Sequence, residues 1–108
     1  MSKIDEFINT LGNELINYAK ENWQQYEKQA VKDGNEFLNK LKADLAVWSK
    51  QVADGELSED ELAWLIEGKK DLAQLESLKQ AGLAQVNIDK FMSGLINIII
   101  STLFKTFL

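Results

Sequence analysis

Residues 86–108 read VNIDKFMSGLINIIISTLFKTFL, and this stretch decides the fold because large apolar side chains are densest in it. Its polar residues recur every three or four positions and fall on one narrow strip of a helical wheel, so apolar groups cover the rest of the helix. At about 1.5–3 kcal/mol for each large side chain buried, leaving about ten of them in water would forfeit on the order of 15–30 kcal/mol. The rest of the chain, a second copy, another protein or a lipid surface must therefore cover this helix.

Composition predicts an all-α fold and a single helical domain over residues 1–108. The chain contains no proline, and leucine, alanine, glutamate, lysine and glutamine dominate it. These residues are good helix formers. No segment shows the period-two alternation of a half-buried strand.

The residue types that are absent exclude several kinds of activity. There is no cysteine, histidine or arginine, and twelve lysines stand against seventeen acidic residues, giving a net charge of −5. Thiol nucleophiles, imidazole bases and the usual zinc ligands are therefore missing. The paired carboxylates that remain lie in polar helix positions, which do not favour acid–base catalysis. Without a concentrated basic surface, nucleic-acid binding is also disfavoured, so we expect a protein that is not an enzyme and has no cofactor.

Residues 3–53 are predicted to form one long helix, because apolar side chains recur along them every eleven residues in two rows. Eleven residues correspond to three turns at about 3.67 residues per turn, which keeps each row on one side of the helix. The rows are Ile4, Leu15, Tyr26, Phe37 and Trp48, and Ile8, Ala19, Ala30, Leu41 and Val52.

The candidate interruption of this helix is Asp33-Gly34-Asn35, a turn-prone tripeptide in which Asn35 could cap a new helix. The apolar rows keep their phase across it, which favours a continuous or mildly bent helix with Gly34 at a close helix–helix approach. A break at residues 33–35 would instead give a four-helix bundle. An unbroken helix of about fifty residues is roughly 75 Å long, so other helices lying end to end, or another molecule, would have to cover it.

A second helix is predicted from about residue 59 to 81. Ser58 and Glu61 have the spacing of a capping box, and acidic residues in the first turn suit the helix dipole. Trp64 lies off the apolar stripe of this helix, and we expect it to pack over a neighbouring helix at the edge of the core; the alternative is that it stacks on a ligand.

The turn before that helix offers the one motif typical of metal binding. Residues 54–61 are similar to the second half of an EF-hand calcium loop. The first half does not match, because Lys50 and Val52 occupy positions where calcium ligands are expected. A tight turn followed by a capped helix explains the matching residues, and we expect no metal site.

The predicted fold is an all-α arrangement in which the long helix 3–53 packs antiparallel against two shorter C-terminal helices. The final helix, 88–108, lies along the first, and the apolar seam between them continues into a partner. We expect a non-enzymatic protein–protein interaction module that binds a second copy of itself or another helical protein. The expected seam residues are Tyr26, Phe37, Trp48, Phe91, Leu95, Ile99, Leu103 and Phe107.

The alternative function is binding to a membrane surface through the amphipathic helix 88–108. Its wide apolar arc suits an interfacial helix, but it carries only two lysines and the chain is acidic overall. The uncharged run from residue 91 to 104 is too short to span a bilayer. The N-terminal stretch is acidic and lacks the apolar core of a signal peptide, so we expect a cytoplasmic protein.

Overall fold

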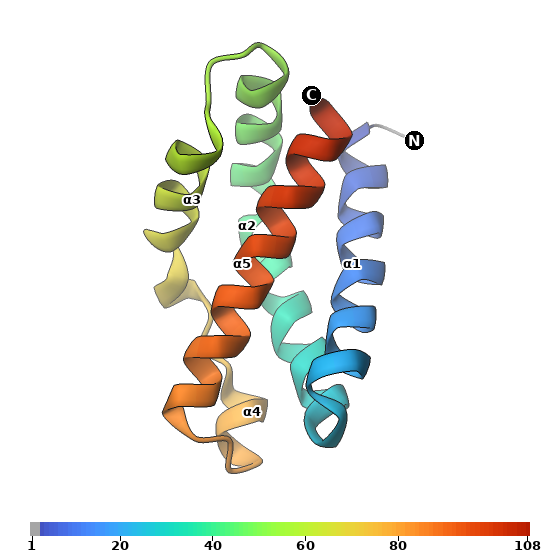
Figure 1. Cartoon of the computed structure of the whole chain (residues 1–108), viewed down its shortest axis with the longest axis vertical. Coiled ribbons are helices and arrows are strands. Elements are labelled where there is room, and N and C mark those ends of the chain that lie inside the picture. The colour runs from blue at the N-terminus through green and yellow to red at the C-terminus, as the bar shows by residue number, and fades with distance from the viewer. Residues whose placement is uncertain (1–2) are drawn as a thin grey trace.

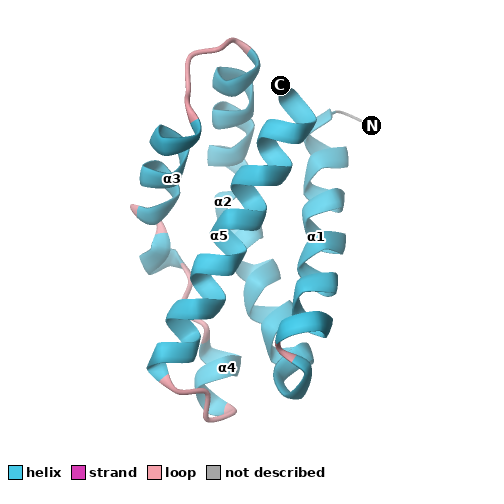
Figure 2. Ribbon diagram, in the orientation of Figure 1, coloured by secondary structure: helices cyan, strands magenta, loops and turns pink. Residues whose placement is uncertain are grey.

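The computed structural model describes residues 3–108, and the chain runs alternately down and up the long axis of a helical bundle (Figure 1). Helix α1 (Lys3–Asn22) and helix α2 (Glu27–Ala53) form an antiparallel pair. A broken third segment contains α3 (Glu59–Glu67) and α4 (Glu76–Gln80), and α5 (Gln85–Phe107) completes the bundle. Figure 2 shows helices joined by short loops, with no strand among residues 3–108. The all-α prediction is confirmed, with a long helix packed against shorter ones.

The chain reverses at Trp23, so the predicted helical span 3–53 consists of two helices. Trp23 has φ −131° and ψ 42°, outside the helical region, and a 3-10 turn at Gln24–Tyr26 leads into α2. A helix of roughly 75 Å would not fit in a molecule whose longest dimension is 42 Å. The reversal instead lets the apolar faces of α1 and α2 cover one another. The bundle foreseen as the alternative is therefore the architecture, but its break lies at Trp23 and not at residues 33–35.

Gly34 remains inside α2, where it permits the close helix–helix approach expected from the sequence. A Cβ atom at this position would lie 2.7 Å from both Cδ atoms of Leu15 in α1. Leu15 is fully buried, so its side chain has little room to move away. The turn-prone tripeptide is helical because this contact and the surrounding core favour a straight path for α2.

Helix α3 begins at Glu59, as the capping box predicts. The Ser58 Oγ accepts a hydrogen bond from the Glu61 N–H at 3.2 Å, and the Ser58 N–H donates to Glu61 Oε1 at 3.0 Å. This backbone hydrogen bond lowers the pKa of Glu61 below its usual 4.5. The helix ends at Glu67, well before the predicted residue 81, and a 3-10 turn at Lys70–Leu72 follows.

Asp33 of α2 determines where the third segment becomes helical again. Its side chain is only 2% exposed, and its two carboxylate oxygens accept the backbone N–H groups of Leu78 at 2.8 Å and Ser77 at 3.3 Å. Amides in the first turn of a helix have no partner within the helix itself. Asp33 therefore caps α4 from across the bundle, next to Leu75, which has a left-handed φ of 52°.

Helix α5 is the central element of the core and packs against α1, α2 and α3. It begins at Gln85, slightly before the predicted residue 88, and no side chain caps its start. The buried side chains of α5 are Ile88, Phe91, Met92, Leu95, Ile96, Ile99, Thr102 and Leu103. The stretch that decides the fold is therefore covered largely by the chain itself.

Candidate interaction surface

The predicted seam lies inside the core of the single chain. Phe37, Phe91, Leu95, Ile99 and Leu103 are fully buried, Trp48 is buried, and Tyr26 and Phe107 are partly buried at its edge. The structure thus gathers these residues in one apolar cluster, with α1, α2 and α3 covering the apolar side of α5. A partner would reach the seam only if these helices separated.

An aromatic cluster of Tyr18, Trp23 and Phe91 packs the α1–α2 turn against α5. The Phe91 ring stacks on Tyr18 with ring centroids 5.7 Å apart and meets the Trp23 ring edge-on at 6.0 Å. The Tyr18 hydroxyl donates to the Phe91 carbonyl at 3.2 Å, and a side chain at Gly94 would collide with that hydroxyl. This close packing ties the chain reversal to the first half of α5.

Burial raises the pKa of the Tyr18 phenol above its usual 10.0, and the nearby indole N–H of Trp23 opposes this shift to a smaller extent. That indole nitrogen is buried and has no partner of hydrogen-bonding geometry within residues 3–108. Tyr18 and Trp23 are therefore partly buried residues whose rings pack against the edge of the core.

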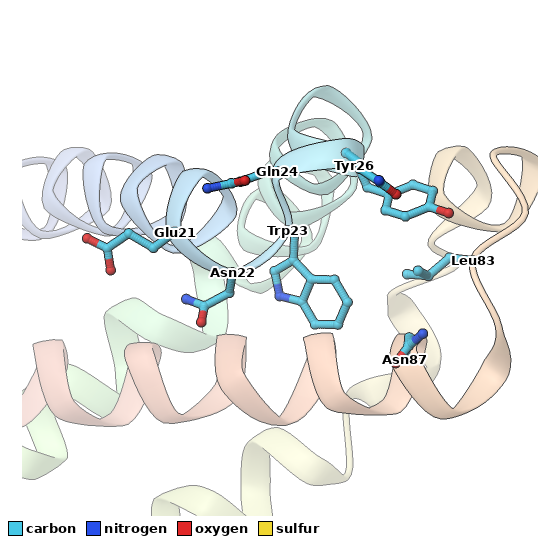
Figure 3. Close-up of a pocket in the computed structure, with 8 residues that line it drawn as sticks. Glu21, Asn22, Trp23, Gln24, Tyr26, Leu83 and Asn87 are labelled. Atoms are coloured by element: carbon cyan, nitrogen blue, oxygen red, sulfur yellow. The ribbon is translucent and has the colours of Figure 1, made fainter.

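A hollow of about 350 Å³ opens beside the turn. Figure 3 shows that the Trp23 ring projects from the turn toward α5 and that Tyr26, Leu83 and Asn87 lie around it. The lining residues are Glu21, Asn22, Trp23, Gln24, Gln25, Tyr26, Leu83 and Asn87. Four of the lining side chains are amides, which can donate and accept hydrogen bonds. The lining contains no nucleophile paired with a base, which is the arrangement that covalent catalysis requires. No group of three or more acidic side chains converges to hold a metal ion in the part of the chain described.

Helix α5 is the helix within residues 3–108 that is long and apolar enough to cross a bilayer by length and composition. An interfacial helix must turn its apolar side to the lipid. In α5 that side faces the core, where Phe91, Leu95 and Ile99 are fully buried. Membrane binding through α5 would therefore require the bundle to open.

The outer side of α3 carries the most exposed tryptophan of the chain. Trp64 is 75% exposed, so the expectation that it packs over a neighbouring helix is wrong. Helix α3 packs mainly against α5, and no other helix of residues 3–108 lies over its opposite side. We call the mainly apolar, shallow hollow on this side the Trp64 face; it is lined by Trp64, Leu65, Glu67, Gly68 and Lys69.

Acidic residues cluster at the start of α3, where the turn from α2 leads into this helix. Asp54, Glu56, Glu59 and Asp60 are all exposed, and no ion pair to a lysine joins any of them in the described residues. Lys69 pairs with Asp44 at 3.6 Å, and Lys70 pairs with Glu67 at 3.3 Å. Lys69 and Lys70, which follow α3, therefore already form ion pairs. The acidic residues at the start of α3 do not form an ion pair with a lysine within residues 3–108.

No protein-family model matches the chain, and neither the curated proteins nor the solved structures include a significant match.

Proposed function

We propose that this chain is a non-enzymatic helical protein–protein interaction module that binds another protein through the Trp64 face. The exposure of Trp64 carries the proposal. Isolated apolar side chains are common on protein surfaces, but tryptophan is among the residues that contribute most to binding energy at interfaces. Trp64 also lies on a regular helix, which holds it in a defined position for a partner.

A second copy is a less suitable occupant of this face than another protein. The predicted self-association seam is occupied by the core of the same chain. Each copy carries a net charge of −5 and acidic residues beside Trp64, and like charges oppose association of two such faces. The proposal therefore retains the interaction module expected from the sequence and assigns it a different partner surface.

A photo-crosslinking amino acid at position 64 tests this proposal. We expect a discrete adduct in a cytoplasmic extract of the source cells, since cytoplasm is the compartment expected from the sequence. Unlabelled wild-type protein should compete with adduct formation, whereas the Trp64→Ala variant should compete poorly. Val86, which is 62% exposed at the start of α5, is the matched control position. Absence of an adduct at position 64, or equal competition by both unlabelled proteins, would contradict the proposal.

A further inference from the structure

We infer that the partner segment seated on the Trp64 face is cationic, rich in lysine or arginine, and carries an apolar side chain that packs beside Trp64. This inference rests on the proposed function and names the chemical class of the partner. Two features of the surface support it: an exposed helix face with a large aromatic ring, and acidic residues without a lysine partner at the start of the same helix.

The charges lie where a partner over Trp64 would meet them. Asp60 precedes Trp64 by four residues and Glu67 follows it by three, so both project from the same side of α3. Both side chains are exposed; Glu67 pairs with Lys70 at 3.3 Å, whereas no lysine pairs with Asp60 in the described residues. The face of the tryptophan ring is itself electron-rich and attracts lysine or arginine side chains. The ring and the carboxylates thus favour the same kind of group.

Fold stability does not account for all of these acids. Glu59 and Asp60 lie in the first turn of α3, where the helix dipole favours negative charge. Asp54 and Glu56 instead follow the last turn of α2, where the dipole is negative and acidic side chains are unfavourable. Their charge therefore adds to the negative potential at this end of the molecule without stabilising the helix that precedes them.

The same observations exclude the other classes of occupant. A second copy and an anionic lipid surface are both negatively charged, so the net charge of −5 and the acidic residues beside Trp64 oppose each of them. A purely apolar partner would leave the Asp60 carboxylate partly desolvated and unpaired, which is costly. A cationic segment can form a cation–π contact with the Trp64 ring and ion pairs with the nearby carboxylates at the same time.

The probe for this inference is a fluorescein-labelled, lysine–leucine amphipathic peptide, with a glutamate–leucine peptide of the same length as the negative probe. Anisotropy titrations of the full chain should show binding of the lysine peptide that weakens as ionic strength rises. Trp64→Ala should weaken it roughly five- to tenfold. Val86→Ala, which shortens another exposed apolar side chain, should have no effect.

The contribution of the acidic residues at the start of α3 to peptide binding is tested with a matched pair of double variants. Glu59→Gln/Asp60→Asn removes two negative charges beside the Trp64 face, and Glu14→Gln/Glu21→Gln removes two from α1, across the bundle (Figure 1). We expect the first pair to weaken binding several-fold more than the second. Circular dichroism should show that all variants remain helical.

Two outcomes overturn the inference. If the lysine peptide does not bind at low ionic strength, the partner class is wrong, although a competed crosslink at position 64 would still support the interaction function. If both double variants weaken binding equally and Trp64→Ala has no effect, the attraction is only that of the overall charge of −5. A missing crosslink contradicts the proposed function itself, so the two failures are distinguishable.

Discussion

Asp33 shows how one side chain can determine the course of a distant segment. Its local sequence, Asp-Gly-Asn, is typical of a turn, yet it lies inside a helix and caps another one. The capped amides lie 44 and 45 residues further along the chain. No local pattern contains that partner, which is why the sequence predicted the helical state of residues 33–35 but not the role of Asp33.

Replacing Asp33 with alanine should lower the free energy of unfolding by about 1–3 kcal/mol, because two buried N–H groups lose their acceptor. Urea titration measures that loss. Hydrogen exchange should accelerate most at the Ser77 and Leu78 amides. Asp33→Asn retains one acceptor oxygen, so it should have an intermediate effect. Unchanged exchange at these two amides in the alanine variant would show that Asp33 does not hold the start of α4.

Glu61 should contribute stability that depends on pH. Its pKa in the folded state is lower than its usual 4.5, so the ionised form favours folding. The contribution is present above pH 4.5 and is lost as the pH falls through the lowered pKa. The difference in unfolding free energy between wild type and Glu61→Gln should therefore shrink in acid, as measured by urea titrations at several pH values. A difference that is the same at neutral and acidic pH would contradict this account.

At the scale of whole helices, the predictions were accurate where local chemistry decides a boundary. Ser58 and Glu61 form the capping box that their spacing indicates. The end of α1 is different, because Asn22, Trp23 and Gln24 include neither glycine nor proline, and the reversal depends on packing of Trp23 against Phe91. The eleven-residue rows could not reveal the break, since each helix buries one face and the rows continue in phase through both.

Two glycines inside helices allow the close approach of α1 and α2 to be tested. Gly34→Ala should destabilise the protein by about 1–3 kcal/mol, because the new methyl group meets Leu15 and overpacking outweighs the gain of about 1 kcal/mol in helix propensity. Gly12 has nothing within 4 Å of an added Cβ, so Gly12→Ala should stabilise by up to about 1 kcal/mol. Thermal and urea unfolding of both variants measure the contrast. Equal stabilisation by the two substitutions would mean that α1 and α2 are less closely packed than described.

At the scale of the whole molecule, the sequence correctly required that residues 86–108 be covered but left open what covers them. The answer depends on the reversal at Trp23, which brings both α1 and α2 against α5. The candidate site was also difficult to predict, because it too depends on how the helices pack in three dimensions. Trp64 was identified as lying off the apolar stripe, but its exposure follows from α3 packing mainly against α5, a tertiary arrangement with no local signal.

Because the seam is covered within one chain, we expect light scattering after size exclusion to give a mass of 12.3 kDa in detergent-free buffer. The unfolding midpoint should also be independent of protein concentration, since no subunit association contributes to stability. A defined oligomer whose melting temperature rises with concentration would contradict the closed single-chain core and return attention to the predicted seam.

The position of α5 in the chain has a consequence for biosynthesis. Helices α1 and α5 meet near their outer ends, where the Phe7 and Phe107 rings lie 5.3 Å apart, so the core is closed by a helix that is translated after α1, α2, α3 and α4. At about 5–20 residues per second, the 23 residues of α5 take roughly 1–5 s to synthesise. During that time the apolar faces of α1, α2 and α3 lack their common partner. Folding should therefore be completed only after α5 has left the ribosome, and the nascent chain should be a client for chaperones until then.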